Sequence, residues 1–300
     1  MRILTLFLLL LFGSSAWAEP QFKYDGLRTK TVQKGGAIHL VVLGDGYLKK
    51  DEGVFEQDAT RALNRLWSVS PFKELRNCFS VHLVYVESLR GTGSGSAAGR
   101  STLFAFGSEE SSGNHVSIKG QAEVRKAAAN APKADVIILL TTLTGRAHGQ
   151  GNLVVLTTNG HDAVAHEMGH SVGDLGDEYD SSQHLNDRRP IPSGRDLAPA
   201  NLTTSEFIDP TDQKTIAKTA KWGHFLELPG AFPLVSAYQG GYYRSVDVWR
   251  PSYRCVMRSS QEGSYCPVCH EEMTRKIMTA AGQSFNDQAY HKRFPLSNWR

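Results

Sequence analysis

Hydrophobic and polar positions follow two rhythms along the first part of this chain. Residues 37–43, AIHLVVL, form a short apolar run that ends at a Gly-Asp-Gly turn, as a buried strand does. Residues 79–86, FSVHLVYV, alternate and are rich in β-branched and aromatic side chains, so they predict a second strand. Between them, apolar residues recur at helical spacing and predict an amphipathic helix that ends before Pro71: Phe55, Ala59, Ala62, Leu63 and Leu66.

The middle of the chain continues this alternation. Residues 120–130 are rich in Ala and Lys and predict a helix, whereas residues 135–141, DVIILLT, predict a strand that is buried on both faces. Residues 152–158, NLVVLTT, predict a shorter strand that leads into another helix. Alternating strands and helices of this kind are typical of an α/β sheet covered by helices.

The periodicity fades in the C-terminal part. Residues 181–215 are rich in Ser, Pro, Asp and Asn and predict irregular chain, and the Gly- and Ser-rich residues 91–99 predict a loop. A last helix is expected from about Cys266 to about Ala280. The sequence contains no internal repeat and no clear linker, so we expect one domain.

The first 18 residues have the layout of a secretory signal peptide. Arg2 precedes the apolar residues 3–12, and Ala16-Trp17-Ala18 fits an A-x-A cleavage site. This apolar run is too short for a membrane anchor, which needs about 20 apolar residues. We therefore expect a mature chain from Glu19 onward, secreted or periplasmic, without a stable membrane anchor.

Composition narrows the class of partner. A chain of 300 residues with 40% hydrophobic content can form one large domain or two modest ones. The formal net charge is +3, and removal of the predicted signal peptide takes away only Arg2 and leaves +2. Basic and acidic residues are interspersed, and no basic block indicates binding to nucleic acid or to a membrane surface.

The run HEMGHSVGDLGDEYD, residues 166–180, carries the candidate chemistry. On a helix, His166 and His170 lie on one face and can both direct an imidazole nitrogen at one metal ion. Glu167 can take a proton from a water molecule on the metal while that water attacks an amide carbonyl. The pattern H-E-x-x-H also occurs by chance on surface helices, but the export signal, the preceding strand and the following acids favour a metal site.

This run resembles the active-site helix of the IgA-protease-type metallopeptidases, which reads approximately H-E-x-G-H-x-x-x-x-L-x-D-E-Y. The similarity extends to LVVLGDGY near the start of the predicted mature chain, to residues 70–88, to YQGGYYRSVDVWRPSYRCVMR (238–258) and to YCPVC (265–269). The resemblance implies one zinc ion and hydrolysis of peptide bonds in a protein or peptide substrate. It does not imply cleavage of immunoglobulin A.

The resemblance also implies a fold. We expect an α/β, metzincin-like zincin with a mixed sheet, an active-site helix and a largely irregular C-terminal subdomain. The catalytic domain is expected over residues 19–300, with an upper part over about 19–173 and a lower part over about 174–300. Residues 152–158 would form the edge strand to which an extended substrate adds as a further strand.

The family's functional residues carry over one by one. His166 and His170 match zinc ligands, Glu167 matches the catalytic base, and Asp177 matches the acid of D-E-Y. Met257, in RCVMR, matches the methionine of a Met-turn, which packs beneath the metal site and supports it.

The third metal ligand is the least determined part of this site. A metzincin places it six residues after the second His, where this chain has Gly176. We prefer Asp177, one residue later, with Gly173 and Gly176 expected to supply the backbone freedom that the loop needs. Glu178 or a more distant His remains an alternative, and both acids are not expected to bind together because successive side chains of an extended segment point to opposite sides.

These features predict a secreted zinc metalloendopeptidase in which Glu167 acts as general base on a zinc-bound water. Two alternatives remain: a zincin-fold protein that binds a partner without catalysis, and a zinc amidase that acts on cell-wall peptides. Tyr179, Tyr243 and Tyr253 are candidate donors to the tetrahedral oxyanion. The sequence does not predict an oligomeric state.

The cysteines, Cys78, Cys255, Cys266 and Cys269, allow several chemistries. In an exported protein we expect a disulfide that joins Cys255 to Cys266 or Cys269. Residues 266–270, CPVCH, also match a c-type haem attachment signal and a redox motif at a helix start. A structural zinc held by the last three cysteines and His270 has suitable ligand types at an unfamiliar spacing.

Two shorter motifs have simpler interpretations. GDGY, residues 44–47, predicts a tight turn, because no Lys-Ser/Thr follows as in a phosphate loop. Asn201-Leu202-Thr203 matches an N-glycosylation acceptor, which matters only in a eukaryotic secretory pathway.

Overall fold

The computed structural model describes residues 26–88, 102–110, 113–180 and 190–299. The predicted signal peptide, the predicted loop at 91–99 and residues 181–189 lie outside the described part of the chain. Within the described ranges, no helix combines the length and apolar character that crossing a membrane requires.

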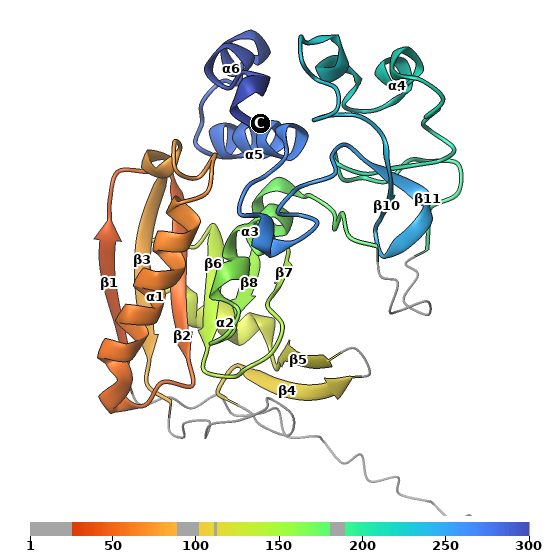
Figure 1. Ribbon diagram of the computed structural model, residues 1–300. Helices are drawn as coiled ribbons and strands as arrows, with labels where there is room; N and C mark the ends of the chain where they lie inside the picture. Colours follow the sequence, from red (N-terminus) through yellow and green to blue (C-terminus); the bar gives the residue numbers. More distant parts are fainter. Residues whose placement is uncertain (1–25, 89–101, 111–112, 181–189, 300) are drawn as a thin grey trace, which may run out of the picture.

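A mixed sheet of six strands forms the centre of the structure (Figure 1). Its order is β1-β3-β2-β6-β8-β7. The strands are β1 (Leu27–Gln33), β2 (Ile38–Asp45), β3 (Phe79–Val86), β6 (Val136–Thr141), β7 (His148–Gln150) and β8 (Leu153–Leu156). The four central strands run parallel, and β1 and β7 run antiparallel to their neighbours at the two edges. Parallel strands are buried on both faces, which explains their continuous apolar runs.

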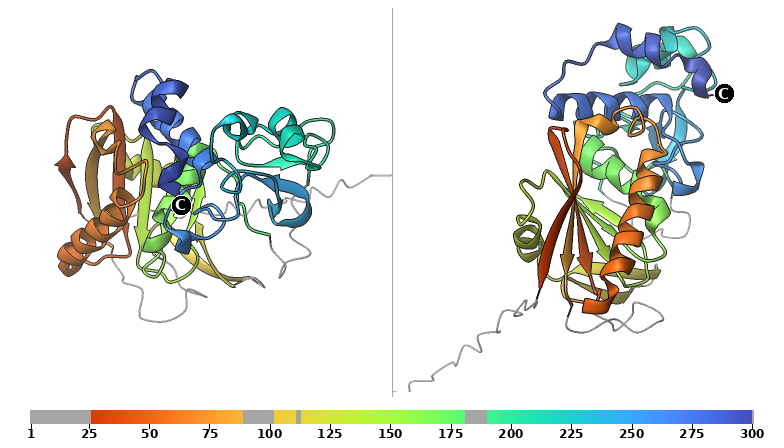
Figure 2. Two further views of the ribbon diagram at one scale, coloured as in Figure 1. Left: turned by 45° about the horizontal axis from the view of Figure 1, so that its top comes forward. Right: turned by 90° about the vertical axis from the view of Figure 1, so that its left-hand side faces the viewer.

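Helices cover both faces of this sheet. Helices α1 (Glu52–Trp67) and α3 (Val164–Gly173) lie on one face and α2 (Gln121–Ala128) lies on the other, as Figure 2 shows. Successive residues of β2 point to opposite faces of the sheet. Leu40 and Val42 belong to the hydrophobic core on the α1 and α3 face, and Val41 and Leu43 belong to the core on the α2 face. The hairpin of β4 (Ala105–Glu110) and β5 (Gly113–Ile118) adds to the second face.

The C-terminal part of the chain lies beyond one end of the sheet, against α3 (Figure 1). Its helices are α4 (Gln213–Thr219), α5 (Pro267–Ala280) and α6 (Asp287–Arg293), and its strands are β9 (Thr203–Thr204), β10 (Tyr238–Gly241) and β11 (Arg244–Arg250). Turns, 3-10 turns and irregular segments connect these short elements.

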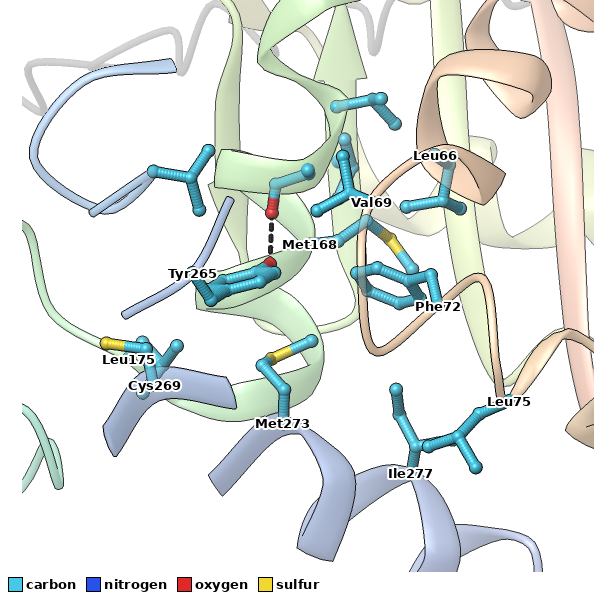
Figure 3. Packing of buried hydrophobic residues seen from close by; sticks show 14 of the residues in the cluster. Leu66, Val69, Phe72, Leu75, Met168, Leu175, Tyr265, Cys269, Met273 and Ile277 are labelled. Atoms are coloured by element: carbon cyan, nitrogen blue, oxygen red, sulfur yellow. Dashed lines mark hydrogen bonds between the residues drawn. The ribbon is translucent and has the colours of Figure 1, made fainter. Parts of the chain in front are cut away.

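One hydrophobic cluster joins this C-terminal part to the sheet (Figure 3). The buried ring of Tyr265 contacts Phe72, with 6.4 Å between ring centroids, and its hydroxyl donates to the carbonyl of Ala165 in α3. From α5, Met273 and Ile277 enter the same cluster and are fully buried. The two parts therefore share a core and support α3 from both sides.

The elements with strong periodicity form where the sequence predicts them. The predicted strand over 79–86 is β3, the strand over 135–141 contains β6, and the last predicted helix is α5. The α/β class with a mixed sheet is confirmed. No pattern in the sequence predicted β1, β7, β9, α4, α6 or the β4–β5 and β10–β11 hairpins.

The predicted edge strand is wrong. Residues 152–158 contain β8, which lies between β6 and β7, and the last strand in the order on this side is β7. Gly151, with a φ of 57°, turns the chain between β7 and β8 and lets these strands pair as a hairpin. The sequence gives little sign of β7, because His148–Gln150 is a strand of three residues without apolar alternation.

Truncation of Phe72 tests the shared core. Phe72 is fully buried between Phe79 and Tyr265, so Phe72→Ala should lower the free energy of unfolding by about 3–5 kcal/mol. Phe106→Ala is the matched control, because Phe106 is 39% exposed and should lose only a small part of that amount. Urea denaturation measures both variants, and equal losses would contradict this packing.

Candidate active site

Helix α3 places the two histidines of the H-E-x-x-H motif one turn apart on its buried side. The Nε2 atoms of His166 and His170 lie 3.2 Å from each other. Each Nδ1 lies 2.8 Å from a backbone carbonyl, that of Val256 for His166 and that of Leu175 for His170. A carbonyl can only accept, so both Nδ1 atoms carry a proton, which leaves Nε2 of each ring as the atom that binds a second proton or a metal ion.

Asp177 completes a triangle with these two nitrogens. Its Oδ1 lies 3.1 Å from Nε2 of His166 and 3.1 Å from Nε2 of His170. Ligand atoms 2.0–2.1 Å from a tetrahedral zinc lie about 3.3 Å from one another, close to these edges. The three ligand types and their spacing therefore fit one zinc ion.

The pKa shifts of His166, His170 and Asp177 show that a positive charge among these side chains is stabilised. Burial disfavours the charged form of all three side chains. Hydrogen bonds between the histidines and Asp177, together with the attraction between their opposite charges, outweigh burial; they raise the pKa of both histidines and hold the pKa of Asp177 well below its usual range. A divalent cation can replace these protons and stabilise the same carboxylate.

The loop after α3 turns through Asp174 rather than through a glycine. Asp174 has a φ of 50°, in the left-handed region, and its carboxylate pairs with Lys276 at 2.7 Å. The predicted role of Gly173 and Gly176 in backbone freedom is wrong, because neither has a positive φ. Both make room instead: an added Cβ would lie 2.4 Å from Met273 Sδ at Gly173 and 2.4 Å from Leu202 Cδ1 at Gly176.

Asn201 holds this loop in place. Its Oδ1 accepts from the N–H of Gly176 at 2.9 Å, and its Nδ2 donates to the carbonyl of Gly176 at 2.9 Å and to Oε1 of Glu178 at 2.9 Å. Asn201 is fully buried, so its side chain is not accessible for glycosylation in the folded chain. No local sequence pattern indicates this role, because Asn201 lies 25 residues from Gly176 along the chain.

Backbone hydrogen bonds fix the D-E-Y segment on both sides. The N–H of Glu178 donates to the carbonyl of Met257 at 2.9 Å, and the N–H of Tyr242 donates to the carbonyl of Asp177 at 2.8 Å. The side chain of Met257 is fully buried beneath α3. Gly169, between the two histidines, permits this approach, because an added Cβ would lie 2.4 Å from Met257 Sδ.

Glu167 lies buried beside the triangle, with 6% of its surface exposed. Burial raises the pKa of its carboxyl, and the charges of His166, His170 and Arg146 oppose this shift. A carboxylate with a raised pKa is a better proton acceptor, as a general base requires. Arg146 lies just before β7 and belongs to no recognisable motif, so its sequence context does not indicate a charge near the site.

Two of the three candidate tyrosines lie at this site. The ring of Tyr179 stacks on His166, with 6.2 Å between centroids, and its hydroxyl donates to that of Tyr243 at 2.7 Å. Tyr253 is 60% exposed and contacts Tyr238 and Arg258 instead. The hydroxyl pair is the better candidate for binding an oxyanion.

The cysteines differ from the prediction. All four are free thiols, so the predicted disulfide between Cys255 and Cys266 or Cys269 is not formed in this structure. His270 does not join them, because its Nε2 lies 2.7 Å from Ser70 Oγ and its Nδ1 lies 2.8 Å from the hydroxyl of Tyr290. Glu178 lies beside the cysteines, in the place that the sequence analysis gave to His270.

The comparison with protein families identifies the class. The family described as IgA Peptidase M64 matches residues 28–233 and 229–277, which include the α3 motif, Asp177 and Met257. Members of this family are peptidases, and the family implies that the enzyme uses a metal ion. The chain belongs to the IgA Peptidase M64 family, which confirms the resemblance seen in its motifs. A search of curated proteins gave no match.

A substitution at Gly169 tests the contact beneath the histidines. Gly169→Ala should displace Met257 and lower the free energy of unfolding by about 1–3 kcal/mol, because the added methyl group overpacks this contact. Gly53→Ala is the matched control, since an added Cβ at Gly53 in α1 meets nothing within 4 Å and alanine favours the helix. Thermal unfolding compares the two, and an unchanged Gly169→Ala variant would contradict the predicted contact.

Proposed function

We propose that this chain is an exported zinc metalloendopeptidase with a metzincin-like zincin fold. One observation carries the proposal: Nε2 of His166, Nε2 of His170 and Oδ1 of Asp177 form a triangle with edges of 3.1, 3.1 and 3.2 Å. Membership of a peptidase family supports the reaction class, and the signal-like residues 1–18 support export. Residues 19–173 form the upper part and residues 174–300 the lower part of the proposed catalytic domain.

The proposed ligands are His166, His170 and Asp177. A zinc ion bound there would act as a Lewis acid: it would polarise the scissile carbonyl and increase the acidity of the attacking water. Glu167 accepts the proton from the attacking water and passes it to the leaving amine. The Tyr179–Tyr243 hydroxyl pair donates to the oxygen that gains charge as water adds to the carbonyl.

Strand β7 is the proposed binding site for the substrate backbone. It is the edge strand next to α3, and an added Cβ at Gly149 would lie 2.6 Å from the carbonyl of Glu167. An extended peptide that pairs with β7 therefore lies beside the general base. Arg146, just before β7, supplies a positive charge close to this peptide.

Neutralisation of the general base tests catalysis. Glu167→Gln should lower peptide cleavage by about 10²–10⁴-fold or more, because proton transfer is lost while the metal ligands remain. A digest of a broad peptide library measures turnover, and metal analysis of the native protein should give the wild-type zinc content. Glu206→Gln, at an exposed glutamate, is the matched control and should retain wild-type activity.

The same digest distinguishes the other candidate functions. Zinc-loaded wild-type protein that releases no fragments would identify a binding protein and overturn the proposal. Release of peptides from peptidoglycan without cleavage of the library would identify an amidase. Full activity in Glu167→Gln would show that another group is the base.

Removal of the acid ligand tests the metal centre. Asp177→Ala should lower the zinc content by one ion per chain relative to wild type, because two ligands hold zinc far less tightly than three. Asp174→Asn is the matched control, since this acid lies three residues earlier, pairs with Lys276 on the surface and has a φ of 50°, which asparagine tolerates. Zinc retained at the wild-type level after dialysis of Asp177→Ala against a chelator would assign the third ligand elsewhere.

A further inference from the structure

A second cluster of metal-ligand side chains lies next to the proposed catalytic centre. Its ligand atoms are a carboxylate oxygen of Glu178 and the sulfurs of Cys255, Cys266 and Cys269, all within 4.8 Å of one another. Each of these residues is at most 2% exposed. Three sulfurs and one oxygen from buried side chains are a full ligand set for a tetrahedral ion.

The carboxylate of Glu178 has one oxygen without a protein partner. Its Oε1 accepts from Asn201 at 2.9 Å and from Cys269 Sγ at 3.0 Å. Its Oε2 is buried and has no hydrogen bond. An unsatisfied buried carboxylate oxygen is costly, and a bound cation would remove that cost.

The backbone around the cluster favours thiolates. The N–H groups of Met257 and Cys266 point at Cys255 Sγ, at 3.4 and 3.3 Å. Cys266 is the N-cap of α5, a helix of 14 residues, and Cys269 lies in its first turn. The partial positive charge at a helix N-terminus stabilises a thiolate, which is the form that binds metal.

We propose that Glu178, Cys255, Cys266 and Cys269 bind a second, structural divalent ion, of which zinc is the best match. Thiolates select soft metals, and a tetrahedral set rich in sulfur is typical of zinc. At a zinc–sulfur distance of about 2.3 Å, the sulfurs lie about 3.8 Å apart, within the spread of this cluster. A site with four protein ligands has no open position for a substrate, so its role is structural.

The position of the ion defines what it would stabilise. Glu178 follows Asp177 directly, Cys255 precedes Met257 by two residues, and the other two cysteines begin α5. One ion would therefore link three segments: the loop that carries Asp177, the turn that carries Met257, and helix α5. A cavity of about 810 Å³, lined in part by Tyr265, Cys266 and His270, adjoins the cluster at Cys266.

A disulfide accounts for fewer of these contacts. It would use two of the three sulfurs, and Oε2 of Glu178 would still have no hydrogen bond and no cation beside it. The metal uses all four side chains, including the carboxylate that no cysteine pairing explains.

Cobalt substitution tests the site in the whole protein. Protein produced with cobalt in place of zinc should bind two ions per chain and show sulfur-to-cobalt charge-transfer absorption in the near ultraviolet, which a centre of nitrogen and oxygen ligands cannot give. Cys269→Ser should lose one ion and most of this absorption. Cys78→Ser, at a buried cysteine outside the cluster, should keep both.

Two further measurements make the outcome decisive. His170→Ala should lose one ion and keep the sulfur bands, so failure of the proposed catalytic centre is distinguishable from failure of the second site. If Cys269→Ser does not fold, the wild-type protein alone decides. Cobalt protein without sulfur bands, or an intact mass lower by two hydrogens that recovers on reduction, would overturn the proposal in favour of an empty site or a disulfide.

Discussion

Three electron-rich atoms lie within 3.2 Å of one another inside this protein, and the rest of the site depends on how they are held. Two imidazole lone pairs and a carboxylate oxygen repel one another unless a positive charge lies among them. In water this repulsion would separate them, but burial and packing prevent such a separation here. Ligands that are held in place before the ion arrives favour tight binding of a cation.

Segments that are distant in the sequence hold His166, His170 and Asp177 in place. Helix α3 sets the spacing of His166 and His170, and backbone carbonyls at Val256 and Leu175 fix both rings through Nδ1. Asn201 holds the loop that presents Asp177. The shared core around Tyr265 packs the C-terminal part against α3. The site therefore lies where the sheet and the C-terminal part meet.

Periodicity and the α3 motif predicted much of this arrangement. Runs such as FSVHLVYV favour a buried strand, and the helical spacing of His166 and His170 places both side chains on one face of α3. A motif predicted that Asp177 is the third ligand, and the structure places it beside both histidines. No local pattern shows that Asn201, 25 residues from Gly176, holds the loop that carries it. Strand β7 is too short to carry a period, and the close contacts at Gly169 and Gly173 appear only when the partner side chains are known. The cysteine spacing left disulfide and metal open, because Glu178 joins the cluster through the fold and not through sequence proximity.

Anomalous diffraction from crystals of the purified protein, collected on both sides of the zinc absorption edge, tests the proposed catalytic centre most directly. We expect an anomalous zinc peak about 2.0–2.1 Å from Nε2 of His166, Nε2 of His170 and Oδ1 of Asp177. No peak at that position in zinc-saturated crystals, or a zinc ion held there without Asp177, would contradict the proposed centre.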